Sequence, residues 1–484
     1  MKKYILFLSA FLIVACSENP SNIKEIATVP EIYPDYVGVE IPSGIAPLNF
    51  GMASKSYNLV DVIVSANDGS CIQSQGVTTD FDIDDWHSLT QKSKGDSLKI
   101  VVRAKIKGKW LSFVPFSIYV SNDSLDAYGL TYRRIEPGYK VYKRLGIYER
   151  NLSNFEETTL FSNTELAGAC VNCHTANRGS NEQFLFHVRG DLGGTVVSNN
   201  GNTEVLDAKS DKIIGSLVYP SWHPDGRFVA CSSNTTRQAF HMNKDKRIEV
   251  FDQKSDIVVY DTKEHNILTS DLINKTETYF ETFPSFSADG KKIYFCTEES
   301  DKSKVEVKNM QYKLCSIDFD AETQKFGNSI DTIVDMSNQN LSIALPRTSP
   351  DGRFIMFTTC DYGTFPIWHK EADLWLLRLA DNQLIRLDNV NSDDTESFHN
   401  WSNNSRWFVF SSRRDDGLFT RLYIAHCDEN GKCSKPFLLP QRNPKEYYSM
   451  LFDSYNTPDF ATGKVNVDAK SVVSKIKNGK ITID

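Results

Sequence analysis

The sequence has 484 residues, with 54 lysines and arginines against 62 aspartates and glutamates, so its formal net charge is −8. This acidic balance, without a basic patch that has interleaved aromatic residues, argues against nucleic acid as a partner. The length suits one large domain and a smaller one, and the 12% aromatic content with frequent Gly, Asn and Asp turns favours an all-β protein.

The first 16 residues have the features of an export signal. Lys2 and Lys3 precede an apolar run over residues 4–15, which is too short to span a membrane as a mature helix. Ile13-Val14-Ala15-Cys16 resembles a lipobox, at which bacterial lipoproteins are cleaved and acylated on the cysteine. We expect a signal peptide over 1–16, lipid on Cys16, a tether over 17–28 and a lipid-anchored location in the cell envelope, on the periplasmic or outer-membrane side. The alternative is an ordinary secretory signal that contains a cysteine.

Residues 29–131 predict a small β-sandwich. Residues 60–64, 98–104 and 116–120 alternate apolar and polar side chains, as half-buried strands do. Proline is frequent in residues 29–50, so that part is expected to be extended and rich in turns. The domain carries no constellation of catalytic residues.

From about residue 132 the sequence repeats itself. Each copy reads as a strand, an Asp-Gly or similar turn, and a second strand, and the copies are residues 219–230, 283–294, 345–356 and, more weakly, 398–409. Outer-strand pairs lie between the copies, and four strands per unit around a ring make a β-propeller. We therefore predict a propeller over 132–460 with six blades, or seven, in which residues 447–460 close the last blade. Residues 461–484 are expected to be a C-terminal tail.

Cys170-Val171-Asn172-Cys173-His174 has the pattern that holds a c-type haem. In such a site the two thiols bond to the porphyrin vinyl groups and the adjacent histidine ligates the iron. The motif therefore predicts a covalent haem c on Cys170 and Cys173 with His174 as the axial ligand. Export from the cytosol agrees with this, because haem c is attached outside the cytoplasmic membrane. The alternatives are a redox disulfide or half of a zinc site.

The repeats resemble the TolB-type propeller repeat over about residues 139–439. A propeller with a c-type haem motif, preceded by Tyr33-Pro34-Asp35-Tyr36-Val37-Gly38 and Ile45-Ala46-Pro47-Leu48-Asn49-Phe50, also resembles the middle region of the hydrazine synthase alpha subunit. That resemblance implies a six-bladed ring that holds a haem. Because the Cys-x-x-Cys-His stretch stands where the next inner hairpin of the TolB-type repeats belongs, we expect the inner hairpin of one blade to be rewritten as a haem-attachment loop. It does not imply hydrazine chemistry, because this chain has a single Cys-x-x-Cys-His motif.

In TolB-like blades the strand before the Asp-Gly turn lies innermost, so its beginning lies at one mouth of the central channel. We expect residues 170–174 at that mouth, together with His399. The loops at the same end carry Arg189, Arg237, Asp361, Arg413 and Arg414. His399 is the first candidate for a distal haem ligand and His187 the second. Arg189, Arg413 and Arg414 are candidates to pair with haem propionates or an anionic substrate, and His399, Arg413 and Arg189 are the catalytic candidates.

These patterns predict a membrane-anchored c-type haem protein that acts in electron transfer or in small-molecule redox chemistry. Such a protein would have a redox partner protein. If it is an enzyme, it would be a haem-dependent oxidoreductase. The alternative is a non-enzymatic TolB-like envelope scaffold that binds a protein or peptide at the channel mouth, with Cys170 and Cys173 in a disulfide or on zinc. Among the other cysteines, Cys427 and Cys433 flank an Asn-Gly turn and could close a disulfide across a hairpin, but the sequence does not tell whether they are bonded.

Overall fold

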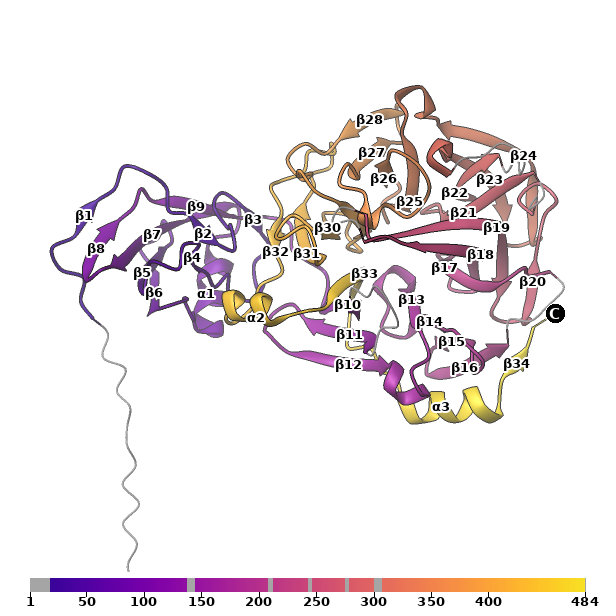
Figure 1. Cartoon of the computed structure of the whole chain (residues 1–484), viewed down its shortest axis with the longest axis horizontal. Helices are drawn as coiled ribbons and strands as arrows, with labels where there is room; N and C mark the ends of the chain where they lie inside the picture. The colour runs from indigo at the N-terminus through magenta and orange to yellow at the C-terminus, as the bar shows by residue number, and fades with distance from the viewer. Residues whose placement is uncertain are drawn as a thin grey trace, which may run out of the picture.

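The computed structural model describes residues 18–136, 144–207, 212–242, 246–274, 278–299 and 307–483. They form a six-bladed β-propeller with a smaller, mainly β domain docked on one side (Figure 1). The predicted signal peptide and Cys16 lie outside the described residues. In the part of the chain that is described, no helix is long and apolar enough to cross a membrane.

Each blade is an antiparallel sheet of four strands, to which blade 2 adds a fifth. With the innermost strand first, blade 1 contains β33 (Ser454–Ala461), β10 (Gly129–Ile135), β11 (Leu145–Asn151) and β12 (Glu157–Ser162). Blade 2 contains β13 (Val171–Ala176), β14 (Gln183–Val188), β15 (Gly194–Asn199), β16 (Asn202–Asp207) and the parallel β34 (Ile481–Thr482). Blade 3 contains β17 (Ser216–Trp222), β18 (Phe228–Phe240), β19 (Ile248–Asp261) and β20 (Asn266–Leu268).

The other three blades follow in chain order. Blade 4 contains β21 (Tyr279–Phe286), β22 (Lys292–Glu299), β23 (Lys313–Asp320) and β24 (Lys325–Val334). Blade 5 contains β25 (Ser342–Thr348), β26 (Phe354–Cys360), β27 (Asp373–Arg378) and β28 (Gln383–Arg386). Blade 6 contains β29 (Glu396–Trp401), β30 (Trp407–Ser412), β31 (Arg421–His426) and β32 (Phe437–Leu438).

The ring closes because the chain end returns to blade 1. The innermost strands contact one another in the order β33, β13, β17, β21, β25, β29 and back to β33. Since β33 comes from the C-terminal part and β10–β12 from before blade 2, blade 1 joins the two ends of the propeller. This confirms the six-bladed prediction and the role expected for residues 447–460, where α2 (Pro444–Met450) precedes β33.

The C-terminal segment is more than the tail that the sequence suggested. α3 (Ala469–Asn478) buries Val472 and Ile476 in the same apolar cluster as Val196 and Val205 of blade 2. β34 then pairs with β16. The segment thereby covers the outer edge of blade 2, which would otherwise expose an unpaired strand.

Every innermost strand has a bulge at the same place. The bulged residue has a positive φ between 47° and 57° in all six blades: Cys173, Tyr219, Phe283, Leu345, Phe398 and Thr457. The next residue is proline in four blades and a histidine, His174 or His399, in the other two. Cys173 and His174 therefore occupy a repeat position of an ordinary antiparallel hairpin, β13–β14. The expectation that this hairpin is replaced by a haem-attachment loop was wrong. The Cys-x-x-Cys-His motif lies in a regular hairpin whose inner strand has the same bulge as the inner strand of every other blade.

The N-terminal domain is built on one seven-stranded sheet. Its strands are β1 (Lys24–Glu25), β3 (Glu40–Ile41), β5 (Leu59–Ser65), β6 (Cys71–Gly76), β7 (Asp96–Ile106), β8 (Lys109–Ser112) and β9 (Phe116–Val120). A second sheet has two strands, β2 (Ile32–Tyr33) and β4 (Gly51–Met52). The sequence did not predict α1 (Ile83–Lys92), whose first turn is capped by the Asp82 carboxylate and which buries Trp86 and Leu89. The propeller begins at Gly129, three residues before the expected boundary at 132.

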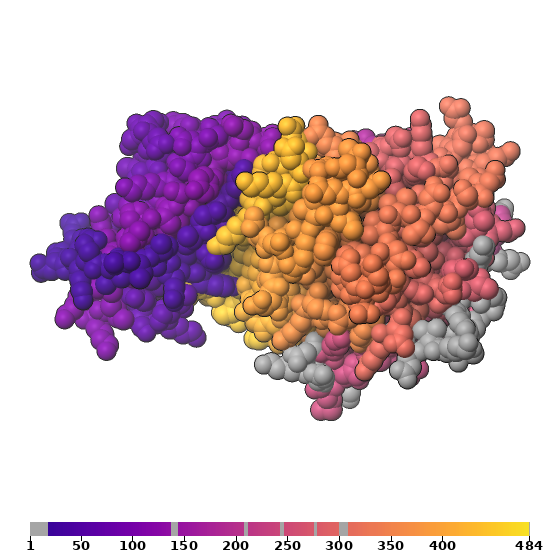
Figure 2. Space-filling view, turned by 90° about the horizontal axis from the view of Figure 1, so that it is seen from above, coloured from indigo at the N-terminus to yellow at the C-terminus, as the bar shows by residue number. Residues whose placement is uncertain are grey.

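The N-terminal domain and blade 6 share one apolar core, which includes Phe50 and Val60 from the first and Trp407 and Ile424 from the second. The two parts are in continuous contact on the face in Figure 2. At the seam the His426 imidazole bonds Asp123 Oδ2 at 2.7 Å, and the two parts therefore form one packed unit. Cys427 and Cys433, at the end of β31, are joined by a disulfide, which answers the question that the sequence left open.

Candidate ligand site at the channel mouth

Cys170 and Cys173 both line one cavity at an end of the propeller channel. Cys170 directly precedes β13 and is half-buried, and its carbonyl accepts a hydrogen bond from the Arg189 backbone N–H at 2.8 Å. Cys173 lies in the bulge and is 8% exposed. Burial raises the pKa of the Cys173 thiol, so the thiol is protonated at neutral pH.

This mouth cavity has a volume of about 680 Å³, within the range of about 300–1,000 Å³ that is typical of small-molecule sites. Its wall combines cationic and apolar side chains, including Arg133, Arg189, Arg413, Tyr219, Phe365, Trp368 and Phe398. Of the predicted site residues, Cys170, Cys173, Arg189 and Arg413 are thus brought together. His174, His187, Arg237, Asp361, His399 and Arg414 do not line this cavity.

A long hairpin forms one wall of the mouth cavity. β18 and β19 have 13 and 14 residues, and their outer parts carry Thr236, Gln238, Phe240, Ile248 and Val250 along the cavity. In Figure 1 the hairpin reaches from blade 3 towards the middle of the ring. The Glu249 carboxylate accepts a hydrogen bond from the Tyr362 hydroxyl of blade 5 at 2.5 Å, so the hairpin spans the mouth. The sequence analysis did not predict this extension, whose signal is the apolar residues Ile248, Val250 and Phe251.

His174 lies one layer deeper than the two cysteines. It lines a second, smaller cavity of about 30 Å³ in the middle of the channel, together with Cys173, Arg347 and His399. Neither ring nitrogen has a hydrogen-bond partner among the described residues, and the ring contacts Phe184 with 5.8 Å between centroids. Burial lowers the pKa of His174 to about 4, so the imidazole is neutral at pH 7, the form that ligates metals.

The two candidate distal ligands lie away from the mouth cavity. His399 Nε2 lies 3.0 Å from the Met356 carbonyl oxygen and Nδ1 lies 3.4 Å from Thr358 Oγ1, so both nitrogens have partners. His187 Nδ1 lies 3.0 Å from Thr195 Oγ1, its Nε2 has no hydrogen-bond partner among the described residues, and its ring lines a separate cavity at the edge of blade 2. Neither imidazole faces the mouth cavity, because each fills space within or between blades. This arrangement therefore offers no distal histidine at the mouth.

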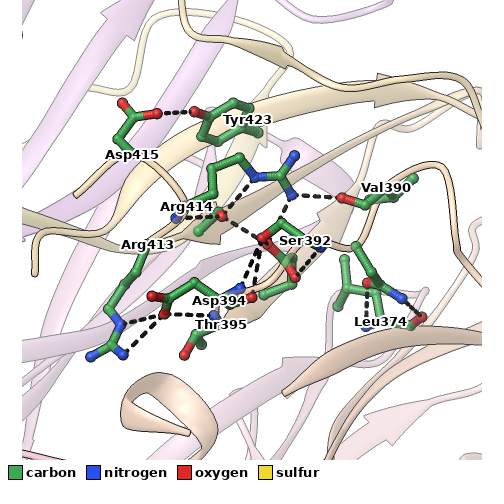
Figure 3. A network of polar contacts seen from close by, with 12 residues as sticks. Leu374, Val390, Ser392, Asp394, Thr395, Arg413, Arg414, Asp415 and Tyr423 are labelled. Carbon is green, nitrogen blue, oxygen red and sulfur yellow. Dashed lines mark hydrogen bonds and ion pairs between the residues drawn. The ribbon is translucent and has the colours of Figure 1, made fainter. Parts of the chain in front are cut away.

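The arginines that follow β30 belong to a buried ion-pair network (Figure 3). Arg413 is fully buried, lies 3.0 Å from Asp394 Oδ1 and stacks over the Trp368 ring at 4.3 Å. Arg414 pairs with the buried Glu396 at 2.8 Å and donates to the Val390 carbonyl. Since carboxylates already balance both cations, their role is to hold the rim of the mouth. Arg133 and Arg189 are two further cations that line the cavity.

The alternatives for the two cysteines find less support. Cys170 and Cys173 are not bonded to each other. Among the residues that the structure describes, no group of three or more His, Cys, Asp or Glu is arranged to hold a metal ion. The cysteines open instead on a cavity of ligand size, which the neutral imidazole of His174 does not line.

No family model matches the sequence, and no curated protein matches it. Among solved structures, a prolyl endopeptidase is 15% identical with a TM-score of 0.35, over 56% of this chain and 36% of that one. A puromycin-hydrolysing peptidase of Mycobacterium tuberculosis is 10% identical with a TM-score of 0.37, over 84% and 57%. The propeller domain of the Trilobed protease of Pyrococcus furiosus is 13% identical with a TM-score of 0.32, over 72% and 96%. The chain thus spans about a third of the prolyl endopeptidase. The assignment of the propeller fold rests on the sheet topology and not on these similarities.

Proposed function

We propose that this chain is a cell-envelope β-propeller that carries a covalent haem at its channel mouth. The observation that carries the proposal is that Cys170 and Cys173 line the same cavity of about 680 Å³. The next residue, His174, has a buried, neutral imidazole with no hydrogen-bond partner among the described residues. A buried imidazole without a well-formed hydrogen bond calls for an explanation, and an iron bound to it would supply one.

The residue types present fit the group in their chemistry, but in this structure the His174 ring lines the small inner cavity of about 30 Å³ and not the mouth cavity, so it would have to turn towards the mouth to ligate an iron there. The thiols of Cys170 and Cys173 would form the thioether bonds, and the imidazole of His174 would be the axial ligand. Arg133 and Arg189 would pair with the propionates, and Phe365 and Phe398 would supply an apolar wall. When bound, a haem supplies one-electron redox chemistry. The proposal includes export, a lipid on Cys16 that anchors the protein to a membrane, and a redox partner protein.

A second candidate function is a TolB-like envelope scaffold that binds a protein or peptide without a haem. One observation favours it. His174 holds the repeat position of His399. The backbone of Thr131 in blade 1 lies close enough to the His174 imidazole to favour its protonated form, as the backbone of Met356 in blade 5 does for His399. In this second function His174 is an inter-blade packing residue like His399.

A variant series separates the two functions. The full-length protein is produced in a host with haem-maturation machinery, and its visible absorption is recorded after acid–acetone extraction. We expect a Soret band that survives extraction in the wild type and in Cys231→Ala, which removes a buried cysteine outside the motif. The band should be lost in the Cys170→Ala, Cys173→Ala double variant. If the wild-type protein is folded and exported but shows no such band, the haem proposal is refuted and the scaffold function remains.

A further inference from the structure

The chain is held on the sheet of the N-terminal domain from Glu18 onwards, within the segment where we expected a tether. The Glu18 backbone N–H donates to Gln75 Oε1 at 2.7 Å, and Gln75 Nε2 donates to the Glu18 carbonyl at 2.8 Å. The Glu18 carboxylate also forms an ion pair with Lys105 of β7. A few residues later β1 pairs with β8. The chain is therefore fixed to the domain from its first described residue.

This attachment decides where a lipid on Cys16 would enter a membrane. Cys16 lies two residues before Glu18, and two residues of chain span at most about 7 Å. The lipid would therefore lie beside Gln75 and Lys105, at the end of the domain where β7 turns into β8. Figure 1 shows β1 and β8 at the end of the molecule that is remote from the propeller.

Four lysines surround this attachment point, and we call them the basic corner. Lys105 lies near the end of β7, Lys107 lies in the turn, and Lys109 begins β8. Lys24 of β1 lies across from Leu111 of β8. Lys24, Lys107 and Lys109 are exposed, and no carboxylate of the described residues lies within ion-pair distance of these three amines.

The basic corner is positive although the chain as a whole is negative. Residues 18–25 and 104–112 contain the four lysines and two acids, Glu18 and Glu25, so their formal charge is +2, against −8 for the whole chain. Charges are screened over about 8 Å at physiological ionic strength. The field of the corner itself, and not the net charge of the chain, therefore decides what binds at this end of the molecule.

We propose that the basic corner lies on the anionic phospholipid headgroups of the membrane that holds the Cys16 lipid. This inference rests on the acylation of Cys16 that the proposed function includes. Lysines beside a lipid anchor add an electrostatic attraction to anionic lipids, and the two together bind a membrane more firmly than either does alone. Because the corner is at the end of the molecule remote from the propeller, the contact holds the channel mouth away from the bilayer.

Vesicle sedimentation of residues 17–484, a chain that contains every described residue and no lipid, tests the corner by itself. At low salt we expect binding to phosphatidylglycerol vesicles and none to phosphatidylcholine vesicles. A Lys107→Glu, Lys109→Glu double variant should bind at least tenfold more weakly, since each lysine near an anionic surface is worth about fivefold. Lys92→Glu, Lys94→Glu is the matched control, because it reverses two exposed lysines beyond the other end of β7, and it should leave binding unchanged. No binding to phosphatidylglycerol, or an equal loss in both double variants, would overturn the proposal.

Acetylation of amines in the lipidated protein tests the same contact on the anchored chain. On phosphatidylglycerol vesicles the exposed lysines of the corner should react at least fivefold more slowly than in nonionic detergent, whereas Lys92 and Lys94 should react at the same rate. Equal rates at the corner would overturn the contact and leave the acylation of Cys16 intact. Mass spectrometry of the mature protein reports that acylation separately, so a failure of the lipid and a failure of the corner are distinguishable. Neither measurement depends on a haem.

Discussion

Asp459 offers a test of how the channel is held together. Its carboxylate is 5% exposed and accepts hydrogen bonds from the Ala176 N–H and from Asn400. Burial raises the pKa of Asp459 to about 6, whereas an unfolded chain has a pKa of about 4. The folded protein therefore binds this proton more tightly, and the stability that results is fully present below about pH 4. It is lost as the pH rises through about 6, and the loss is about 3 kcal/mol.

An Asp459→Asn variant has no charge to bury, so it should be more stable than the wild type at pH 7.5 and not at pH 4. We expect a gain in the free energy of unfolding of about 1–2 kcal/mol at pH 7.5, because about 1 kcal/mol is given back when hydrogen bonds to a charged acceptor become neutral ones. Urea unfolding at the two pH values measures this, with Asp271→Asn at an exposed acid as the control. An effect of Asp459→Asn that is the same at both pH values would refute the reasoning.

Two further changes test the packing around the site. Arg414→Ala leaves Glu396 buried without its ion pair and should cost about 3–5 kcal/mol in urea unfolding, whereas Lys292→Ala, which breaks an exposed pair with Asp318, should cost less than about 1 kcal/mol. Ile476→Ala should cost about 2–5 kcal/mol if α3 is part of blade 2, and Leu384→Ala on an exposed strand should be near neutral. A neutral Ile476→Ala would mean that α3 does not stabilise the blade.

The repeats were enough to predict the propeller, because each copy fixes a hairpin and the copies share their turn. The repeats also showed that one blade lacked a strand, and residues 447–460 were predicted to supply it and so to close the ring. α3 was missed because its apolar face is narrow: among its ten residues, Val472 and Ile476 are the buried ones. Its partner surface on blade 2 is built by residues far away in the sequence.

The site was predicted in part. The position of the innermost strands placed Cys170, Cys173, Arg189 and Arg413 at one mouth, as observed. The sequence also aligned His399 with the prolines of the other blades. It did not reveal that His174 holds the same position, because the bulge lies within the motif and shows only in the backbone angles.

The hydrogen-bond and ion-pair partners of buried side chains could not be predicted from the sequence. His399 bonds to the carbonyl of Met356, 43 residues away. Arg413 pairs with Asp394 and stacks on Trp368, which come from separate loops. Such pairings depend on the neighbouring blade, so a charge that the sequence suggests is available for a ligand is already balanced in the fold.

Mass spectrometry of the mature protein, purified from a host with haem-maturation machinery, tests the central claim most directly. After extraction of non-covalent haem, digestion should yield a peptide that contains residues 170–174 with one haem attached through Cys170 and Cys173. The same peptide with two unmodified thiols, or with a disulfide, in a folded and exported protein would contradict a covalent haem at the channel mouth.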